Sequence, residues 1–208
     1  MRLWELCSGT GSVGKPWRAA GHEVLSLDID PKSGADVICD ILSWEYTDFA
    51  LEPPDVIWCS PPCTQYSIAR SKAKTPRNLE GADALVQRCL DIIRYWNPKV
   101  WWIENPQSGL LKTRPVIQGL PYVDLDYCQY GSIEHAGYRK RTRLWTNAAY
   151  VPRPLCTAKR HRMSAQMGPS KQRGALLPGD NCSLDTLHAL PKELTQEILE
   201  VSTRMIAG

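Results

Sequence analysis

The sequence has little of what would take it out of the ordinary globular class. It contains one Phe, no long hydrophobic run and no internal repeat, and its net charge is only +3 over 208 residues. Without a long apolar segment we expect no signal peptide and no membrane span. A charge of +3 is too small to indicate a nucleic-acid partner by itself. We therefore expect a cytoplasmic protein with one main domain.

A disulfide framework is also missing, although the chain has eight cysteines. They follow no regular pairing pattern, and several lie in apolar, strand-like runs, which suits reduced thiols. The spacings C-x4-H and C-x5-H occur once each, at Cys156 with His161 and at Cys182 with His188. Such spacings can bind zinc, but unpaired loop residues are the simpler interpretation, so we predict no metal site.

Short apolar runs alternate with segments of helical periodicity along most of the chain. We expect strands at residues 3–7, 22–27, 36–39, 55–59, 100–103, 123–127 and 142–146, and helices at 15–20, at 81–96 and from 191 onward. Strands that alternate with helices favour an α/β fold with a mostly parallel sheet covered on both faces.

The stretch DVIWCSPPCTQYS, residues 55–67, places a thiol directly after a strand. Two prolines end the strand, because proline donates no hydrogen bond to a sheet. Cys63 follows them, at the edge of an open α/β sheet where ligands bind. It is a candidate nucleophile, and the alternative is a small apolar residue in a loop.

A glycine-rich turn, residues 8–14, follows the first expected strand and precedes a helix. This context allows close approach of a nucleotide-like ligand, although a tight turn alone would look the same. Asp28 and Asp40 end the next two strands. Either could cap a helix, but with the glycines they favour an adenosine cofactor, whose ribose and adenine they would bind.

Two further groups of polar residues are expected near Cys63. Glu104 ends its own strand, so it should project into the same cleft, unless it is only a salt-bridged acid. Strand alternation would put Arg139, Arg141 and Arg143 on one face, pointing to the strand end that holds Cys63. The alternative for these arginines is a solvated edge strand.

Six segments, in this order, resemble motifs of the C5-cytosine-specific DNA methyltransferases, over roughly residues 1–147. They are ELCSGTGS at 5–12, Asp28-Ile29, Asp40-Ile41, Pro61-Pro62-Cys63-x-x-Tyr66-Ser67, Glu104-Asn105 and Arg141-Thr142-Arg143. Leu85 lies where that family has a cofactor-contacting leucine. The chain departs from the family pattern with Glu5 for Asp, Cys7 for Phe, Ser12 for Gly and Arg139 for Gln.

The resemblance implies a Rossmann-like, seven-stranded fold that binds S-adenosyl-L-methionine. The residues implied to bind this cofactor are Glu5, Cys7, Ser8, Gly9, Thr10, Gly11, Asp28, Ile29, Asp40, Ile41, Pro62 and Leu85. Cys63 would attack C6 of a flipped-out cytosine, Glu104 would hold N3, and Arg141 with Arg143 would hold the base. Other implied substrate contacts are Ser67, Asn105 and Arg139.

The implied function is methylation of cytosine C5 in double-stranded DNA, as in restriction-modification systems. The sequence does not give the oligomeric state, and we expect a monomer on DNA. Such an enzyme would be cytoplasmic, or nucleoid-associated if bacterial or phage-encoded. A tRNA cytosine-C5 methyltransferase and a catalytically silent nucleic-acid-binding protein remain as alternatives.

The resemblance also divides the chain. Residues 1–150 would form the catalytic and cofactor-binding domain, and residues 191–208 a helix that packs back on it. Between them, residues 151–190 would be a short target-recognition segment. Its part from Arg153 to Arg173 has six Lys or Arg and no acidic residue. Phosphate contacts would therefore dominate its binding to DNA, with few base contacts and a short or relaxed recognition sequence.

Overall fold

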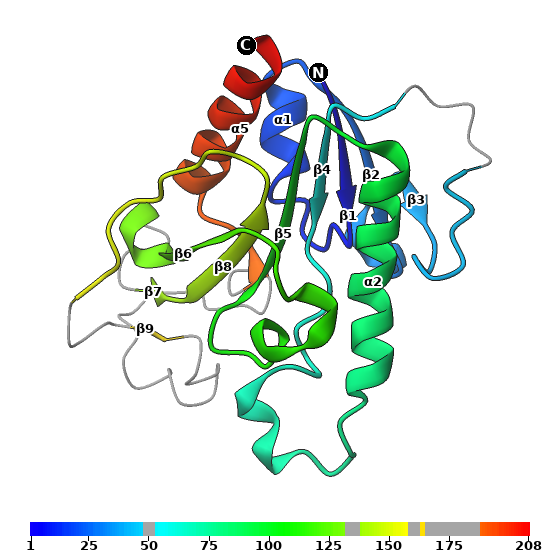
Figure 1. Cartoon of the computed structure of the whole chain (residues 1–208), viewed down its shortest axis with the longest axis vertical. Helices are drawn as coiled ribbons and strands as arrows, with labels where there is room; N and C mark the ends of the chain where they lie inside the picture. Colours follow the sequence, from blue (N-terminus) through cyan, green and yellow to red (C-terminus); the bar gives the residue numbers. More distant parts are fainter. Residues whose placement is uncertain (48–52, 132–137, 158–162, 165–187) are drawn as a thin grey trace.

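A seven-stranded sheet organises the protein, as seen in the computed structural model (Figure 1), which describes residues 1–47, 53–131, 138–157, 163–164 and 188–208. The strand order is β3-β2-β1-β4-β5-β8-β6. The strands are β1 Arg2–Leu6, β2 Glu23–Asp28, β3 Val37–Ile38, β4 Val56–Cys59, β5 Val100–Pro106, β6 Tyr122–Asp126 and β8 Arg141–Thr146. The short strands β7 Tyr138–Arg139 and β9 Met163–Ser164 pair separately.

The sheet is mostly parallel. Strands β1 to β5 pair in parallel, and β8 lies antiparallel between β5 and β6. The chain moves from β1 outward to β2 and β3, then returns to place β4 on the other side of β1. The strand order therefore reverses between β1 and β4, and at such a switch point the carboxyl ends of the strands leave a crevice for ligands.

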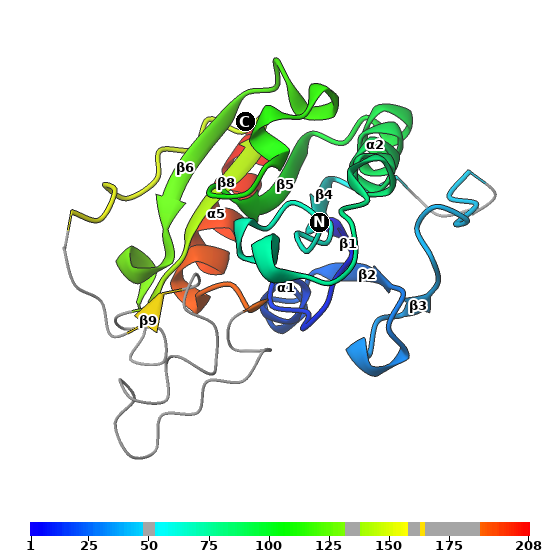
Figure 2. The same cartoon turned by 90° about the horizontal axis from the view of Figure 1, so that it is seen from below.

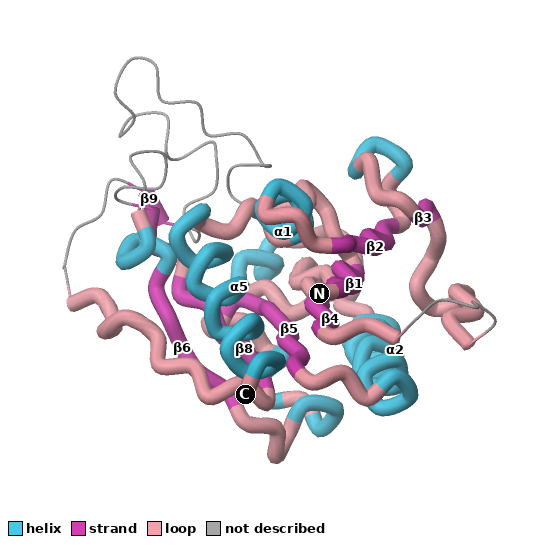
Figure 3. Tube along the Cα trace, turned by 90° about the horizontal axis from the view of Figure 1, so that it is seen from above, coloured by secondary structure: helices cyan, strands magenta, loops and turns pink. Residues whose placement is uncertain are grey.

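Helices cover both faces of the sheet, as Figures 2 and 3 show from opposite ends. Helices α1 (Gly14–Ala19) and α5 (Lys192–Ala207) lie on one face, and α2 (Leu79–Trp96) lies on the other. Short 3-10 segments occur at Pro31–Ser33, Ile68–Lys72, Leu111–Thr113, Pro115–Ile117 and Tyr127–Tyr130. The predicted fold class, a mostly parallel seven-stranded sheet between helices, is confirmed. None of the described helices has the length and apolar character that a membrane span requires.

The caps of α2 explain why this helix is longer than its apolar periodicity predicts. The Asn78 side chain accepts a hydrogen bond from the Gly81 N–H at 2.8 Å, so the helix begins at Leu79 rather than at Gly81. Asn97 adopts a left-handed conformation at the other end, and Pro98 prevents further helix.

Tryptophan takes the place that Phe has in most cores. Five fully buried Trp side chains lie in the two layers beside the sheet: Trp4, Trp17, Trp58, Trp102 and Trp145. Two of them also satisfy their indole N–H groups, since Trp58 donates to Ser60 Oγ at 2.7 Å and Trp102 donates to Ser202 Oγ at 3.2 Å. The second bond connects α5 to strand β5.

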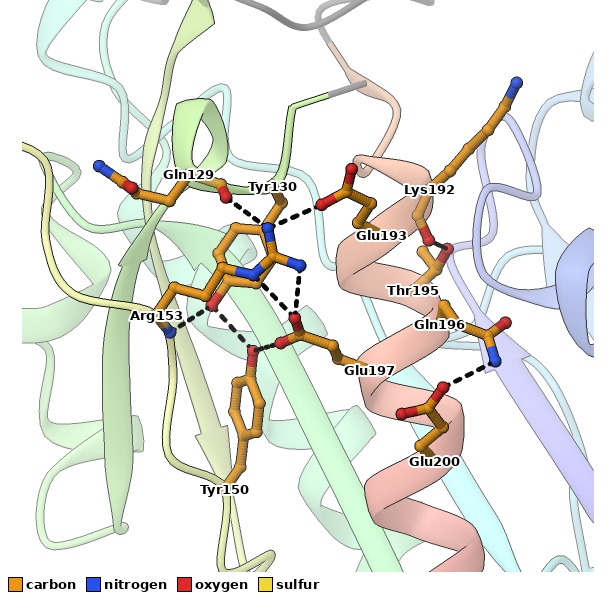
Figure 4. A network of polar contacts seen from close by, with 10 residues as sticks. All are labelled: Gln129, Tyr130, Tyr150, Arg153, Lys192, Glu193, Thr195, Gln196, Glu197 and Glu200. Carbon is orange, nitrogen blue, oxygen red and sulfur yellow. Dashed lines mark hydrogen bonds and ion pairs between the residues drawn. The ribbon is translucent and has the colours of Figure 1, made fainter.

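Arg153 joins α5 to the chain that follows β8 (Figure 4). Its guanidinium donates to Glu197 at 2.8 Å and to both Glu193 and the Gln129 carbonyl at 2.7 Å. Its backbone N–H donates to the Tyr130 hydroxyl at 2.9 Å. Charge-assisted bonds that form a network hold their partners more firmly than isolated surface ion pairs do.

We expect Arg153→Met to lower the free energy of unfolding by about 1–2 kcal/mol, because two carboxylates and a carbonyl lose a shared donor. Urea denaturation followed by tryptophan fluorescence measures the change. Arg94→Met is the matched control: Arg94 makes a more exposed ion pair with Asp91, and its loss should cost less than about 0.5 kcal/mol. Equal effects of the two substitutions would contradict the anchoring role.

Candidate active site

Two adjoining cavities open at the switch point of the sheet. The first, here called the thiol cavity, has a volume of about 250 Å³ and is lined by Cys63 and Glu104 among others. The second, here called the apolar cavity, has a volume of about 470 Å³ and lies between Ile29, Ile41 and Leu85. Both are lined by Cys7, Asp28, Pro62 and Thr64, so they form one continuous crevice.

The turn that carries Cys63 is fixed from two neighbouring strands. Ser60 N–H donates to the Leu6 carbonyl of β1 at 3.1 Å, and the Asn105 amide of β5 donates to the Pro61 carbonyl at 2.9 Å. Asn105 is fully buried and lines neither cavity, so it positions the turn rather than contacting a ligand. Two prolines and two anchors leave the Cys63 thiol with little freedom.

The residues after Cys63 are held by a buried tyrosine. Tyr66 is fully buried, and its hydroxyl donates to Asp83 of α2 at 2.8 Å. Asp83 in turn accepts two hydrogen bonds from Arg114, at 2.9 and 2.7 Å. These contacts anchor the chain after Cys63 to α2. The chain then forms a 3-10 turn over Ile68–Lys72, which the Ser67 hydroxyl caps by accepting from the Ala69 N–H.

The groups that line the thiol cavity include the thiol of Cys63, the carboxylate of Glu104 and the ammonium of Lys140. Lys140 Nζ lies 3.7 Å from Glu104 Oε1, and the Tyr127 hydroxyl donates to the same oxygen at 3.2 Å. Burial raises the pKa of the Cys63 thiol, and the Glu104 charge raises it further, whereas the Lys140 charge lowers it. Glu104 and Cys63 were both predicted for this site, and Lys140 was not.

The glycine-rich turn after β1 forms the floor of the crevice. Cys7, Gly9 and Gly11 have positive φ angles of 56°, 51° and 65°, a conformation that glycine adopts without strain. Ser8, Gly9 and Thr10 line the thiol cavity, whereas Gly11 lines neither cavity. The backbone of this turn is therefore accessible from the thiol cavity, and close approach of a ligand to it stays a prediction.

Glu5 lies beneath this turn and is almost fully buried. Its carboxylate accepts from the Val13 N–H at 3.2 Å, and the Gly14 N–H also donates to it. A Cβ atom on Gly14 would overlap the Glu5 carboxylate and crowd Val24, so a larger residue at this position would displace Glu5. Glu5 was predicted to bind a cofactor, and its contacts show that it holds the turn in place.

Asp28 and Asp40 both line the apolar cavity. Asp28 Oδ2 accepts from the Gly9 N–H at 2.7 Å, and Asp40 Oδ1 accepts from the Leu42 N–H at 3.0 Å. Each carboxylate keeps further lone pairs for a ligand. Ile29, next to Asp28, is 64% exposed at the cavity wall, where an apolar side chain suits the face of a flat ring.

Arg141 and Arg143 do not face Cys63, and the prediction that they do is wrong. Arg141 binds Asp126 at 3.0 and 2.7 Å, Arg143 binds Asp124 at 2.7 and 2.8 Å, and neither lines a described cavity. Side chains along β8 do alternate between the two faces of the sheet, as predicted. However, the buried residues Lys140, Thr142 and Leu144 occupy the face that Glu104 shares, and the arginines occupy the other face. Arg139 lines neither cavity either.

The zinc alternative gains no support from the described residues, which contain no group of three metal-binding side chains. His161 and Cys182 lie outside the described residues. His188 lines the thiol cavity, and Cys156 lies elsewhere, with its backbone N–H donating to Asp126 at 3.0 Å.

Sequence reasoning missed Lys140 and the Asp83–Arg114 pair. A signal for Lys140 was present, because Thr142 and Leu144 mark the buried face of β8 and Lys140 shares their parity. No local pattern indicates the Asp83–Arg114 pair, since the two residues come from different segments that only the fold brings together.

Residues 1–115 match the family model described as C-5 cytosine-specific DNA methylase. The chain is 35% identical, over 186 residues and 83% of both proteins, to the Frog virus 3 (isolate Goorha) protein named "Probable DNA (cytosine-5)-methyltransferase". Among solved structures, a prophage-encoded E. coli protein described as a DNA modification methyltransferase gives a TM-score of 0.53 at 15% identity over 75% of this chain. S. pombe Dnmt2 methyltransferase gives 0.48 at 16% identity over 74%. The chain spans about half the length of these two solved proteins, 52% of each.

Glu5 should make stability depend on pH, because burial raises the pKa of its carboxyl from 4.5 to about 7. The folded state then binds the proton more tightly than the unfolded state, so this contribution is complete at low pH and disappears as the pH rises through about 7. Between about pH 4.5 and 7, we expect the free energy of unfolding to fall by about 3 kcal/mol relative to Glu5→Gln, which cannot titrate. Urea denaturation at stepped pH measures this difference, and a constant difference would refute it.

Proposed function

The chain belongs to the C-5 cytosine-specific DNA methylase family, and on that premise we propose that it transfers a methyl group from S-adenosylmethionine to C5 of cytosine in double-stranded DNA. The observation that carries the proposal is the shared cavity of Cys63 and Glu104, adjoining an apolar cavity at the switch point. A nucleophile and a carboxyl at this edge are what addition to a pyrimidine ring requires.

The crevice fits S-adenosylmethionine by the chemistry of its lining. Ile29, Ile41 and Leu85 would enclose the adenine in the apolar cavity, Asp40 would accept from its amino group, and Asp28 would accept from the ribose hydroxyls. The backbone of Ser8 to Thr10 would approach the remainder, toward the thiol cavity. When bound, the cofactor supplies an electrophilic methyl group.

Cys63 activates the base in this mechanism. C5 of cytosine is a poor nucleophile, and addition of the Cys63 thiolate to C6 makes it enamine-like. Glu104 holds N3 and offsets the charge that develops on the ring. Once C5 is methylated, loss of the C5 proton and departure of Cys63 restore the aromatic ring. A cytosine stacked in a duplex cannot present C6 to the thiol, so the target has to be flipped out.

The parts of the chain outside the crevice have roles in the same proposal. Residues 1–150 form the catalytic domain, and α5 packs back on the sheet through Leu194 and Ile198. The basic segment 151–190 contacts mainly phosphates, so binding weakens steeply with salt. Residues 64–80 pass along the carboxyl edge of the sheet (Figure 2), and in this proposal their basic residues Arg70 and Arg77 would contact phosphates of the bound DNA.

We expect Cys63→Ser to abolish methyl transfer while S-adenosylmethionine still binds, because Cys63 lines the thiol cavity and not the apolar cavity. Incorporation of labelled methyl groups into duplex DNA, and into tRNA in parallel, measures the activity and distinguishes the two substrates. An oligonucleotide with 5-fluorocytosine should become covalently attached to the wild type and not to Cys63→Ser, because fluorine at C5 blocks release of the thiol.

Cys128→Ser is the matched control, since Cys128 is a partly buried thiol that lines neither cavity, and it should methylate at the wild-type rate. Methylation by Cys63→Ser at the wild-type rate would rule out the proposed mechanism. Calorimetric titration with S-adenosylmethionine separates loss of chemistry from loss of cofactor binding.

A further inference from the structure

Lys140 is a buried cation in the wall of the thiol cavity. It lies between β7 and β8 and is only 8% exposed. Its ammonium lies 3.7 Å from Glu104 Oε1 and 4.7 Å from the centre of the Tyr127 ring. Its carbonyl accepts from the Tyr127 N–H at 3.1 Å, which fixes the backbone from which the side chain extends.

The charges around the thiol cavity are unevenly distributed. The titratable groups that line it are Glu5, Cys7, Asp28, Cys63, Glu104, Lys140 and His188, and Lys140 is the only Lys or Arg among the described lining residues. The nearby arginines cannot replace it, because Arg141 and Arg143 are paired with Asp126 and Asp124 on the opposite face of the sheet. One ammonium thus faces several acids and the reactive thiol.

Burying an ammonium costs desolvation free energy unless the charge is paired, so a buried Lys requires groups that offset this cost. Glu104 and the face of Tyr127 offset part of this cost. The separation of 3.7 Å from Glu104 is an ion-pair distance but exceeds hydrogen-bond length, so the N–H donors of Lys140 are not spent on that carboxylate. The ammonium remains able to interact with a ligand in the cavity.

We propose that Lys140 is a further catalytic residue, the cation that stabilises the Cys63 thiolate and then the charge that spreads over the pyrimidine ring. This inference rests on the proposed function. As the bond from Cys63 Sγ to C6 forms, the C5–C6 π pair moves onto the C5–C4–N3 system, and negative charge reaches N3 and O2. The reverse movement releases the thiolate. Lys140 keeps its proton throughout and acts by charge.

The electrostatics of the thiol agree with this role. Burial and the Glu104 charge raise the pKa of Cys63, and the Lys140 charge opposes them. Without Lys140, less thiolate is present at neutral pH, so attack on any electrophile slows. This effect concerns the free protein and does not require that DNA is the substrate.

Alkylation of Cys63 by iodoacetamide tests the inference in the free protein. The rate is followed by mass spectrometry of the Cys63 peptide from about pH 6 to pH 10, since only the thiolate reacts. We expect Lys140→Gln and Lys140→Met to move the midpoint to higher pH and to slow alkylation at neutral pH by about tenfold, whereas Lys140→Arg keeps the wild-type profile. Lys99→Met is the charge control, because Lys99 is exposed at the other end of β5 and should not shift the profile.

A second measurement concerns the reaction itself. Adduct formation with a 5-fluorocytosine duplex and S-adenosylmethionine should slow by about 10²-fold in Lys140→Gln and recover largely in Lys140→Arg. Cofactor affinity should change little, because the adenine and ribose are proposed to bind in the apolar cavity, which Lys140 does not line. If the neutral variants unfold, the alkylation profile of the double variant Lys140→Gln/Glu104→Gln is compared with that of Glu104→Gln, because the double variant leaves no Glu104 carboxylate without its ion-pair partner.

The outcomes separate the two proposals. A wild-type alkylation profile in a folded Lys140→Gln protein would overturn the role of Lys140 even if the wild type methylates DNA. A shifted profile in a protein that methylates neither DNA nor tRNA would support the Lys140–Cys63 coupling and overturn the methyltransferase function instead.

Discussion

The hydrogen bond from the Asn105 amide to the Pro61 carbonyl joins the two strands that carry the candidate active site. Cys63 follows β4 and Glu104 lies on β5, and these strands pair in parallel from Val56 with Val100 to Cys59 with Ile103. Backbone pairing between β4 and β5 ends at Cys59, so this side-chain hydrogen bond continues the connection between the two segments into the proline turn. The distance between thiol and carboxyl thus depends on the sheet and on one buried amide.

The sequence predicted the sheet well because its strands are short apolar runs that end in Pro, Gly or Asp. The acids at the strand ends, Asp28, Asp40 and Glu104, were also predicted, since parallel strands bring their carboxyl ends to one edge. What failed was the orientation of β8. An Arg at every second position indicates a face but not which side of the sheet it covers, and Asp124 and Asp126 on the neighbouring strand bind those arginines. Pairing between strands is long-range information.

Glu5 and Lys140 are both buried charged residues, and they illustrate different effects of burial. Glu5 accepts backbone hydrogen bonds beneath the glycine-rich turn, so its carboxyl shapes the floor of the crevice. Lys140 faces the cavity across from Glu104, so its ammonium sets the local potential. The position of each residue along the chain determines which groups surround its charge. Glu5 therefore has a structural role, and Lys140 has an electrostatic one.

The Arg153 network has a consequence for how this architecture can vary. Arg153 stands just before residues 158–187 and binds Glu193 and Glu197, which follow them. The two ends of that stretch are therefore clamped to each other and to the sheet, independently of what lies between. Loop closure costs grow only slowly with length, so a segment of another length could connect the same two ends while the sheet and the candidate active site keep their arrangement.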